Sequence, residues 1–345
     1  MITGPLAILL LVAGAFLVAW LVTGLVRRLA LNRGMLDVPN ARSSHSIPTP
    51  RGGGLGIVLA TVGVLACMGL SGTGPVSQWV ALAGGLPVAA IGWRDDVRPV
   101  SPLLRMLVHI FAGSWALWWL GGLPPLQVGQ GLVGFGPLAP VIGVIGVIWV
   151  LNLFNFMDGI DGIAGMEAVF IAVSGGLLLI LEPSAPALSL VCLAFGAASA
   201  GFLAWNWAPA RIFMGDVGSG FVGFVIAVLA IAAAATYPAA LFTWLILGGV
   251  FFVDATVTLI RRLARGERAH MAHRSHVYQR LARAWGSHAK VTLAALAINL
   301  GWLLPWAIAT RLWPAGAGWF AIAALLPLVV LSIMLGAGRR EPADT

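Results

Sequence analysis

Residues 1–28 read MITGPLAILLLVAGAFLVAWLVTGLVRR, a stretch without charge that ends at Arg27 and Arg28. The hydrocarbon core of a bilayer is about 30 Å thick, and a helix of about 20 apolar residues crosses it. A cleavable signal peptide carries its basic residues before the apolar segment, whereas here they follow it. We therefore expect this segment to remain as a membrane anchor, with the N-terminus outside and the two arginines in the cytoplasm.

The rest of the chain repeats this apolar character. Of its 345 residues, 60% are hydrophobic and 9% are charged, and the mean hydropathy is +0.96. A soluble core cannot hide so much apolar surface, so the sequence predicts an all-α polytopic membrane protein. Division at Gly/Pro clusters and charges predicts about eleven transmembrane helices and a cytoplasmic C-terminus. The expected spans are 4–26, 53–71, 77–93, 104–122, 138–157, 166–182, 186–206, 217–236, 239–260, 290–310 and 317–338.

The basic residues support this topology. If the loops alternate sides, every Lys and Arg except Arg311 falls on one side, which is nineteen of the twenty. Such an excess marks the cytoplasmic side. The net charge of +8 is explained by topology and by attraction to anionic lipid headgroups. No other feature favours nucleic-acid binding.

The acidic residues follow the basic ones, although membrane orientation does not require them. All carboxylates except Glu182 lie on the same side or, for Asp254, within about two helical turns of it. Six of them come from different parts of the chain and could converge on one pocket: Asp95, Asp96, Asp158, Asp161, Asp216 and Asp254.

The segment Asn152–Gly165 carries the densest polar cluster, where a long apolar stretch ends. Asn152, Asn155 and Asp158 recur every three residues, and Asp161 continues the series. Mg²⁺ prefers oxygen ligands and combines few carboxylates with substrate phosphates and water. Amides that bridge membrane helices would explain the asparagines but not the acids. We interpret this segment as a cation and diphosphate site.

Two further segments carry acids. Asp95 and Asp96 are adjacent and repel each other unless a cation or a guanidinium lies between them; a solvated loop paired with Arg94 and Arg98 is an equally supported interpretation. In Phe213–Gly220, an Asp between glycines opens an apolar helix, where phosphate oxygens can approach the backbone closely. A simple helix N-cap is the alternative there.

Two polar loops indicate ligand contact, although each alone is typical of an ordinary basic juxtamembrane loop. Zinc is not expected in the second loop, because no His-Glu-x-x-His pattern or cysteine pair accompanies its histidines. The first, residues 37–54, contains Arg42, His45 and Arg51; the second, residues 261–289, contains His270, His273, Arg274, His276 and Tyr278.

Taken together and in this order, these motifs resemble the polyprenyl-phosphate N-acetylhexosamine-1-phosphate transferases of glycosyltransferase family 4. Members of that family start the lipid intermediates of O-antigen, teichoic acid and peptidoglycan. The resemblance extends over nearly the whole chain. It rests on Asp-Asp at 95–96, Asn-x-x-Asn-x-x-Asp-Gly-x-x-Gly at 152–162, Met-Gly-Asp-x-Gly-Ser at 214–219 and the His loop at 273–276.

The resemblance implies transfer of a sugar 1-phosphate from a UDP-N-acetylhexosamine to undecaprenyl or another polyprenyl phosphate, with release of UMP and with Mg²⁺ as cofactor, Mn²⁺ being the alternative ion. It assigns catalytic roles to Asp95, Asp96, Asp158 and Asp161. Arg42, His45, Arg51, Arg105, Asn152, His273, Arg274 and His276 become substrate-binding residues, and Asp216, Asn155 and Asp158 become metal ligands.

It further implies one integral membrane transferase domain over residues 1–345 in a bacterial inner membrane. The active site would be cytoplasmic and formed by loops 27–52, 94–103, 158–165, 207–216 and 261–289. The sequence His273-Arg-Ser-His-Val-Tyr-Gln279 is most similar to initiators of O-antigen and other surface polysaccharides, some of which use 6-deoxy N-acetylhexosamines. It therefore points to the lipopolysaccharide branch.

A transporter or lipid flippase with an acidic ion site at the cytoplasmic rim is the alternative function, since intramembrane acids and broken helices also build such sites. A transporter would be expected to carry charges near the bilayer midplane and two related halves. The acids of this chain lie at one rim, and the sequence contains no convincing internal repeat. The sequence therefore favours the transferase.

Overall fold

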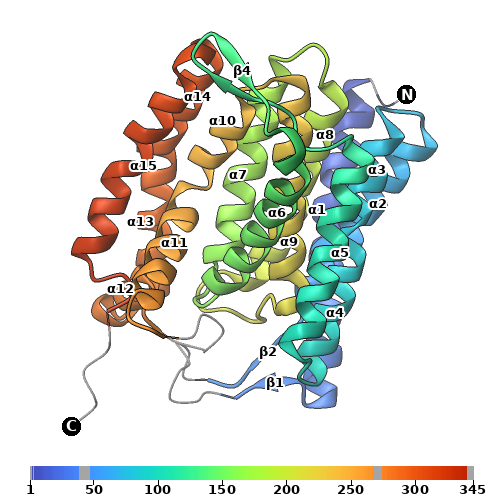
Figure 1. Cartoon of the computed structure of the whole chain (residues 1–345). Helices are drawn as coiled ribbons and strands as arrows, with labels where there is room; N and C mark the ends of the chain where they lie inside the picture. The colour runs from blue at the N-terminus through green and yellow to red at the C-terminus, as the bar shows by residue number, and fades with distance from the viewer. Residues whose placement is uncertain (1, 3, 39–46, 268–273, 340–345) are drawn as a thin grey trace.

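The computed structural model describes residues 2, 4–38, 47–267 and 274–339, which form a bundle of helices (Figure 1). Two short antiparallel strand pairs, β1 with β2 and β3 with β4, are the non-helical elements of this part of the chain. The elements are α1 (Pro5–Arg33), β1 (Leu36–Asp37), β2 (Thr49–Pro50), α2 (Leu55–Leu70), α3 (Val76–Ala83), α4 (Gly85–Val97), α5 (Pro102–Leu120), β3 (Leu126–Val128), β4 (Gly131–Val133), η1 (Gly136–Leu138), α6 (Ala139–Met157), α7 (Ile163–Ile180), α8 (Pro186–Asn206), α9 (Asp216–Thr236), α10 (Ala240–Leu247), α11 (Gly249–Leu263), α12 (Val277–Trp285), α13 (His288–Ile298), η2 (Asn299–Leu303), α14 (Leu304–Leu312), η3 (Pro314–Gly316) and α15 (Ala317–Met334).

In the described residues, nine helices are long and apolar enough to cross a membrane, and the pair α10 and α11 makes a tenth if it counts as one span. The two helices of this pair meet at an angle of 76° in the region where one span, 239–260, was expected. Each of the eleven expected spans is matched by an apolar helix or helix pair. The second, α2, has 16 residues, which gives a length of about 24 Å, so it falls short of a full crossing.

α2 starts later than expected because the residues before it are hydrogen-bonded to another loop. The N–H groups of Gly53 and Gly54 donate to the carbonyl oxygens of Phe213 and Met214, both at 2.9 Å. Gly52 has a φ of +93°, which L side chains rarely adopt. The chain is therefore held in an extended turn against the 213–214 loop, and the helix begins only at Leu55.

The helix α9 lies at the centre of the bundle and is almost wholly buried. Small residues allow other segments to approach its backbone closely, as is common between membrane helices. A Cβ atom added to Gly54 would lie 2.3 Å from the Cα atom of Gly218, and one added to Gly223 would lie 2.7 Å from the Cα atom of Leu151. These contacts fix α9, and with it Asp216 at its start.

The two ends of the bundle differ in chemistry. One end holds β1, β2 and α12 together with the ends of α4 and α6 and the starts of α7 and α9 (Figure 1). The other end carries the β3–β4 hairpin, which packs against α15 and η3. There, Arg311 lies 3.3 Å from Glu182 and 4.8 Å from the ring centre of Tyr237. The acidic cluster lies at the first end.

Candidate active site

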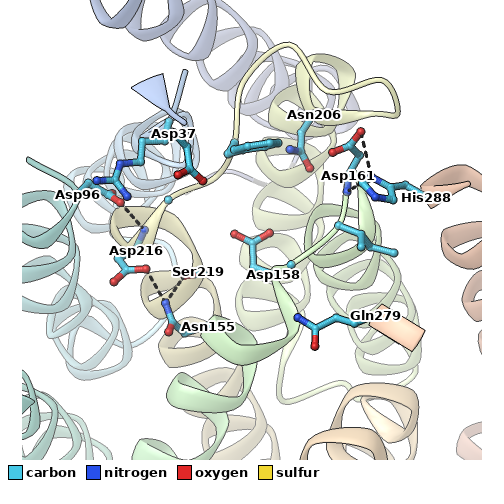
Figure 2. A pocket seen from close by; sticks show the side chains of 15 residues that line it. Asp37, Asp96, Asn155, Asp158, Asp161, Asn206, Asp216, Ser219, Gln279 and His288 are labelled. Atoms are coloured by element: carbon cyan, nitrogen blue, oxygen red, sulfur yellow. Dashed lines mark hydrogen bonds and ion pairs between the residues drawn. The ribbon is translucent and has the colours of Figure 1, made fainter. Parts of the chain in front are cut away.

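A cavity of about 250 Å³ opens among the loops at the first end of the bundle (Figure 2). Each of the five loops that were expected to form the active site contributes to its wall. The lining residues are Asp37, Arg51, Asp96, Asn155, Asp158, Gly159, Ile160, Asp161, Asn206, Phe213, Gly215, Asp216, Ser219, Gln279 and His288. Four of the six acids that could converge, Asp96, Asp158, Asp161 and Asp216, therefore do so.

Asp96 joins two of the sequence motifs. Its Oδ1 accepts the backbone N–H of Asp216 at 3.1 Å (Figure 2). Its Oδ2 accepts the N–H of Val217, also at 3.1 Å. The first N–H groups of a helix have no partner within it, so Asp96 of α4 caps the start of α9. A Cβ atom on Gly215 would lie 2.6 Å from Oδ2 of Asp96, so only glycine leaves room for this cap. Asp96 thereby holds Asp216 in the cavity wall.

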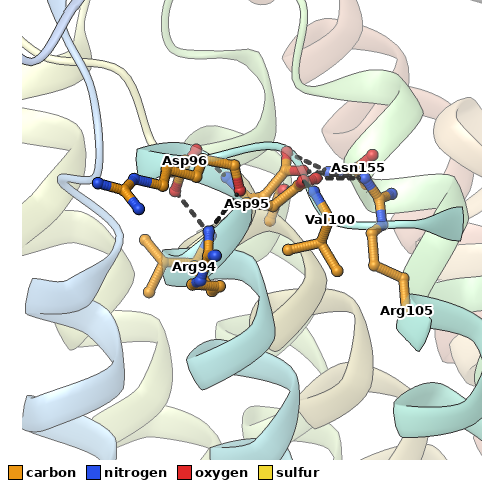
Figure 3. Close-up of polar contacts among 10 residues, drawn as sticks. Arg94, Asp95, Asp96, Val100, Arg105 and Asn155 are labelled. Carbon is orange, nitrogen blue, oxygen red and sulfur yellow. Dashed lines mark hydrogen bonds and ion pairs between the residues drawn. The ribbon is translucent and has the colours of Figure 1, made fainter.

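Asp95 lies beside the cavity and is held by two donors. Its Oδ1 accepts the N–H of Val100 at 2.6 Å, and its Oδ2 accepts Nη1 of Arg105, also at 2.6 Å (Figure 3). The same Nη1 atom lies 3.3 Å from Oδ2 of Asp216. Arg105 thus bridges Asp95 and Asp216, and its positive charge offsets the repulsion between these two carboxylates.

The two asparagines of α6 differ in what they contact. Nδ2 of Asn155 donates to Oδ1 of Asp216 at 2.8 Å and to Oγ of Ser219 at 3.0 Å (Figure 2). Nδ2 of Asn152 donates to the carbonyl of Ile148 in its own helix at 2.8 Å, and Asn152 is not among the cavity residues. Asn155 therefore orients Asp216 through its amide nitrogen. A metal-ligand role for its amide oxygen stays a prediction.

Asp158 and Asp161 lie in the turn between α6 and α7. Burial raises the pKa of Asp158 well above its usual range, and the negative charges of Asp216, Asp96 and Asp161 raise it further. Asp161 is tied down: its Oδ2 accepts the N–H of Ala210 at 3.1 Å and lies 3.3 Å from Nδ1 of His288. The turn thus presents one carboxyl group that resists ionisation and one that is fixed.

These groups fit a hard divalent cation bound together with a substrate. In the part of the chain that the structure describes, no three His, Cys, Asp or Glu side chains come close enough to hold a metal ion by themselves. Mg²⁺ does not need them, because it takes one or two carboxylates and completes its shell with phosphate oxygens and water. Asp158 and Asp216 line one cavity, and a cation between them would offset the repulsion that raises the pKa of Asp158.

Other expected site residues lie elsewhere. Arg42, His45 and His273 fall outside the described residues. Arg105 and Asn152 line a narrow crevice next to the cavity. Arg274 and His276 line neither space; Nδ1 of His276 lies 3.4 Å from Oδ1 of Asp254. The substrate-binding roles of these residues stay predictions.

Asp254 does not line the cavity, and its carboxylate holds the start of α12. Its oxygens accept the N–H groups of Val277 at 2.9 Å and Tyr278 at 3.1 Å. It therefore caps the start of α12, as Asp96 caps α9. The cap fixes the helix that carries Gln279 into the cavity wall.

Several cavity residues were not predicted from the sequence. Asp37 is brought there by the pairing of β1 with β2, in which Asp37 faces Thr49. Gln279, His288 and Asn206 come from three separate helices. Gly286 and Ser287 before α13 are helix-start signals, but they give no indication that His288 faces the acids.

Comparisons with known proteins agree with this geometry. The profile of glycosyl transferase family 4 matches residues 78–234. The chain is 29% identical over 311 residues to the probable undecaprenyl-phosphate N-acetylglucosaminyl 1-phosphate transferase of Bacillus subtilis, covering 77% of this chain and 75% of that protein. It is 30% identical over 317 residues to the decaprenyl-phosphate N-acetylglucosaminephosphotransferase of Mycobacterium leprae, covering 81% and 78%.

A third relative, the phospho-N-acetylmuramoyl-pentapeptide-transferase of Synechococcus elongatus, is 30% identical over 233 residues, which is 62% of this chain and 60% of that protein. The matched family region contains the Asp-Asp, Asn-x-x-Asn and Met-Gly-Asp motifs whose side chains meet at the cavity. The chain belongs to glycosyl transferase family 4 and is one of its polyprenyl-phosphate N-acetylhexosamine-1-phosphate transferases.

Proposed function

We propose that this enzyme uses a UDP-N-acetylhexosamine and undecaprenyl phosphate, works at the cytoplasmic face of a bacterial inner membrane and releases UMP. The observation that carries the proposal is the convergence of Asp96, Asp158, Asp161 and Asp216 on one cavity at one end of the bundle. A nucleotide sugar is water-soluble and the acceptor is a lipid, so a cavity at a membrane rim is where both substrates can meet.

The cytoplasmic placement is supported by charge. Arg51, Arg105 and Arg283 line the cavities at this end, whereas Arg311 lies beside Glu182 at the opposite end. Arg27 lies at the same end as the cavities, where it donates to the carbonyl oxygen of Arg211 in the 207–216 loop. An excess of basic residues marks the cytoplasmic side of a membrane protein. The donor nucleotide is made in the cytoplasm, so this orientation gives it direct access to the cavity.

The size of the cavity indicates how the donor binds. Sites for ligands of drug size usually measure about 300–1,000 Å³, and this cavity of about 250 Å³ is smaller. A second cavity of about 550 Å³ adjoins it and shares Asp161, Phe213 and His288 with it. The donor therefore extends through both, with its diphosphate beside Asp216 and its nucleotide beside Asp161.

The acids beside the diphosphate suit a family that uses Mg²⁺. Asp216 and Asp158 would hold the ion together with phosphate oxygens, while Asn155 orients Asp216. When bound, Mg²⁺ neutralises charge on the diphosphate and stabilises the departing UMP. Arg51, in the same wall, supplies a planar guanidinium that suits phosphate oxygens.

The reaction needs positioning more than base catalysis. An oxygen of the acceptor phosphate attacks the β-phosphorus of the UDP-sugar, a new P–O bond forms, and the bond to the bridging oxygen breaks as UMP leaves. A phosphate monoester has a second pKa near 6, so the acceptor is already largely ionised at neutral pH. Asp96 is committed to two backbone N–H groups, and Asp95 to Arg105 and Val100. Their role is to place Asp216 and Arg105.

The lipid diphosphate sugar formed in this way would start a cell-surface polysaccharide of the O-antigen type. This part of the proposal rests on the sequence His273-Arg-Ser-His-Val-Tyr-Gln279, whose last residue lines the cavity. The Bacillus and Mycobacterium relatives are named as N-acetylglucosamine enzymes, so UDP-N-acetylglucosamine and its 6-deoxy analogues are the donors to test first.

The test is turnover by the purified protein in detergent with undecaprenyl phosphate, Mg²⁺ and a panel of UDP-N-acetylhexosamines. We expect UMP release together with a lipid diphosphate sugar detected by mass spectrometry. Asp216→Asn should abolish both, and Glu182→Gln, at the opposite end of the bundle, should change neither. A fully active Asp216→Asn variant would contradict the role of Asp216 as a metal ligand. A folded wild-type protein that turns over no donor of the panel would refute the proposed substrates.

A further inference from the structure

His288 lies where the two cavities meet. It is the first residue of α13 and lines both the cavity of about 250 Å³ and the adjoining one of about 550 Å³ (Figure 2). No sequence motif pointed to it, and the reaction as described above gives it no role. Asp161 and Phe213 are the other residues that belong to both walls.

His288 contacts Asp161 at two atoms. Its Nδ1 accepts the backbone N–H of Asp161 at 3.3 Å and lies 3.3 Å from Oδ2 of the same residue. One helical turn later, Oγ1 of Thr292 donates to the carbonyl oxygen of Asp161 at 3.2 Å. Residues four apart share a face of a helix. His288 and Thr292 therefore contact Asp161 from the same face of α13.

Asp161 depends on such outside contacts because its own segment is neither helix nor strand. It sits in the turn between α6 and α7, just before Gly162, which has a φ of +78°. The remaining ties come from α8 and the loop after it: Oδ1 of Asn206 accepts the N–H of Gly162 at 3.0 Å, and the N–H of Ala210 reaches Asp161. Without His288, the α13 side of this turn loses its contact with the carboxylate.

We propose that His288 is a positioning residue that fixes Asp161 at the junction of the two cavities and thereby sets the affinity for the uridine nucleotide of the donor. The inference rests on the proposed function, in which Asp161 places the nucleotide. It concerns donor binding, whereas the diphosphate chemistry belongs to Asp216 and Asp158. His288 variants should therefore weaken donor binding and leave the turnover rate at saturating donor nearly intact.

A purely architectural role for His288 would have a different signature, and Ser287 supplies the matched control. Oγ of Ser287 accepts the N–H of Lys290 at 3.3 Å and so caps the start of α13. Ser287→Ala removes this cap and loosens the same helix end, but it leaves the imidazole in place. A residue that only anchored α13 would give the same result as Ser287→Ala.

The experiment compares the wild-type protein with His288→Ala, His288→Asn and Ser287→Ala by steady-state kinetics and by calorimetric titration with UMP. Loss of the hydrogen bond that Nδ1 accepts from the backbone N–H of Asp161 predicts a rise of about three- to tenfold in donor KM and UMP Kd for His288→Ala, with kcat and acceptor KM within about twofold. His288→Asn, which keeps an acceptor near the position of Nδ1, should recover most of the loss.

Wild-type turnover with an unchanged donor KM in His288→Ala would overturn the inference alone. Equal donor KM values in His288→Ala and Ser287→Ala would also overturn it, because the imidazole would then act only through α13. A folded wild-type protein that neither turns over a UDP-sugar nor binds UMP would overturn the proposed function, and the inference with it.

Discussion

Gly92→Ala tests whether the placement of Asp216 by its neighbours governs catalysis. Gly92 lies in α4 against the start of α9, and a Cβ atom there would lie 2.3 Å from the carbonyl oxygen of Asp216 and 2.5 Å from its carbonyl carbon. Ordinary van der Waals contacts begin near 3.4 Å. To lengthen the Cβ–O distance from 2.3 to 3.4 Å, the two backbones would have to separate by about 1.1 Å. The contacted atoms are backbone, and no side chain can rotate away to make room.

The size of the effect follows from this displacement. Overpacking of this kind costs about 1–3 kcal/mol of folding free energy. A misplacement of about 1 Å in a catalytic group lowers the rate by about 100-fold. Because Asp96 follows Gly92 by four residues in α4 and caps α9 at Asp216, the same shift also stretches this cap. We therefore expect kcat to fall about 100-fold while every chemical group of the site is retained.

The assay is UMP release at saturating donor and acceptor, with thermal unfolding in detergent as a check of folding. Gly146→Ala is the matched control, since Gly146 also lies within an apolar helix and has no atom within 4 Å of its added Cβ. Gly146→Ala should keep full activity. A folded Gly92→Ala protein with kcat within about threefold of wild type would refute the reasoning that a shift of 1 Å at Asp216 controls the rate.

Three further predictions concern the acids. Arg105→Gln removes the bridge between Asp95 and Asp216 and should lower kcat/KM about tenfold or more; unchanged kinetics would exclude the bridge. The pKa of Asp158 is raised in the folded protein, so without metal the ionisation of Asp158 destabilises the fold as the pH rises. Asp158→Asn should therefore raise the Tm in EDTA at pH 8 but not at pH 4. A lower Tm of this variant at pH 8 would contradict the prediction. A cation that binds Asp158 competes with a proton there, so the apparent affinity of the wild-type protein for Mg²⁺ should increase with pH; a Mg²⁺ titration of activity that does not change with pH would count against Asp158 as a ligand.

The apolar segments were predictable because hydropathy and charge act locally. The uncharged stretch before Arg27 became α1, and the matches extend to the last helix. The break between α10 and α11 was missed because residues 239–253 contain no charge that would mark a boundary. Gly248 carries the bend, and a Cβ there would lie 2.7 Å from the ring of Phe252. A glycine inside an apolar run does not reveal such a contact.

The acids of the site were predictable as a group but not in their individual tasks. Their gathering on one side followed from their spacing along a chain that crosses the membrane repeatedly. Which acid faces the cavity depends on contacts between residues far apart in sequence, such as Asp96 with Asp216 or Asp161 with His288. Asp37 shows the same limit, since the pairing of β1 with β2 brings it to the wall.

Asp96 and Asp254 show how similar residues divide the work of building such a site. Each accepts two successive backbone N–H groups at the start of a helix, at 216 and 217 for Asp96 and at 277 and 278 for Asp254. The first N–H groups of a helix have no partner within it, so each acid holds the start of a helix that points toward the cavity. One cap presents Asp216 and the other presents Gln279. The carboxylates at this end of the protein therefore do two kinds of work. Asp158, Asp161 and Asp216 line the cavity, Asp254 holds a helix that contributes to the cavity wall, and Asp96 does both.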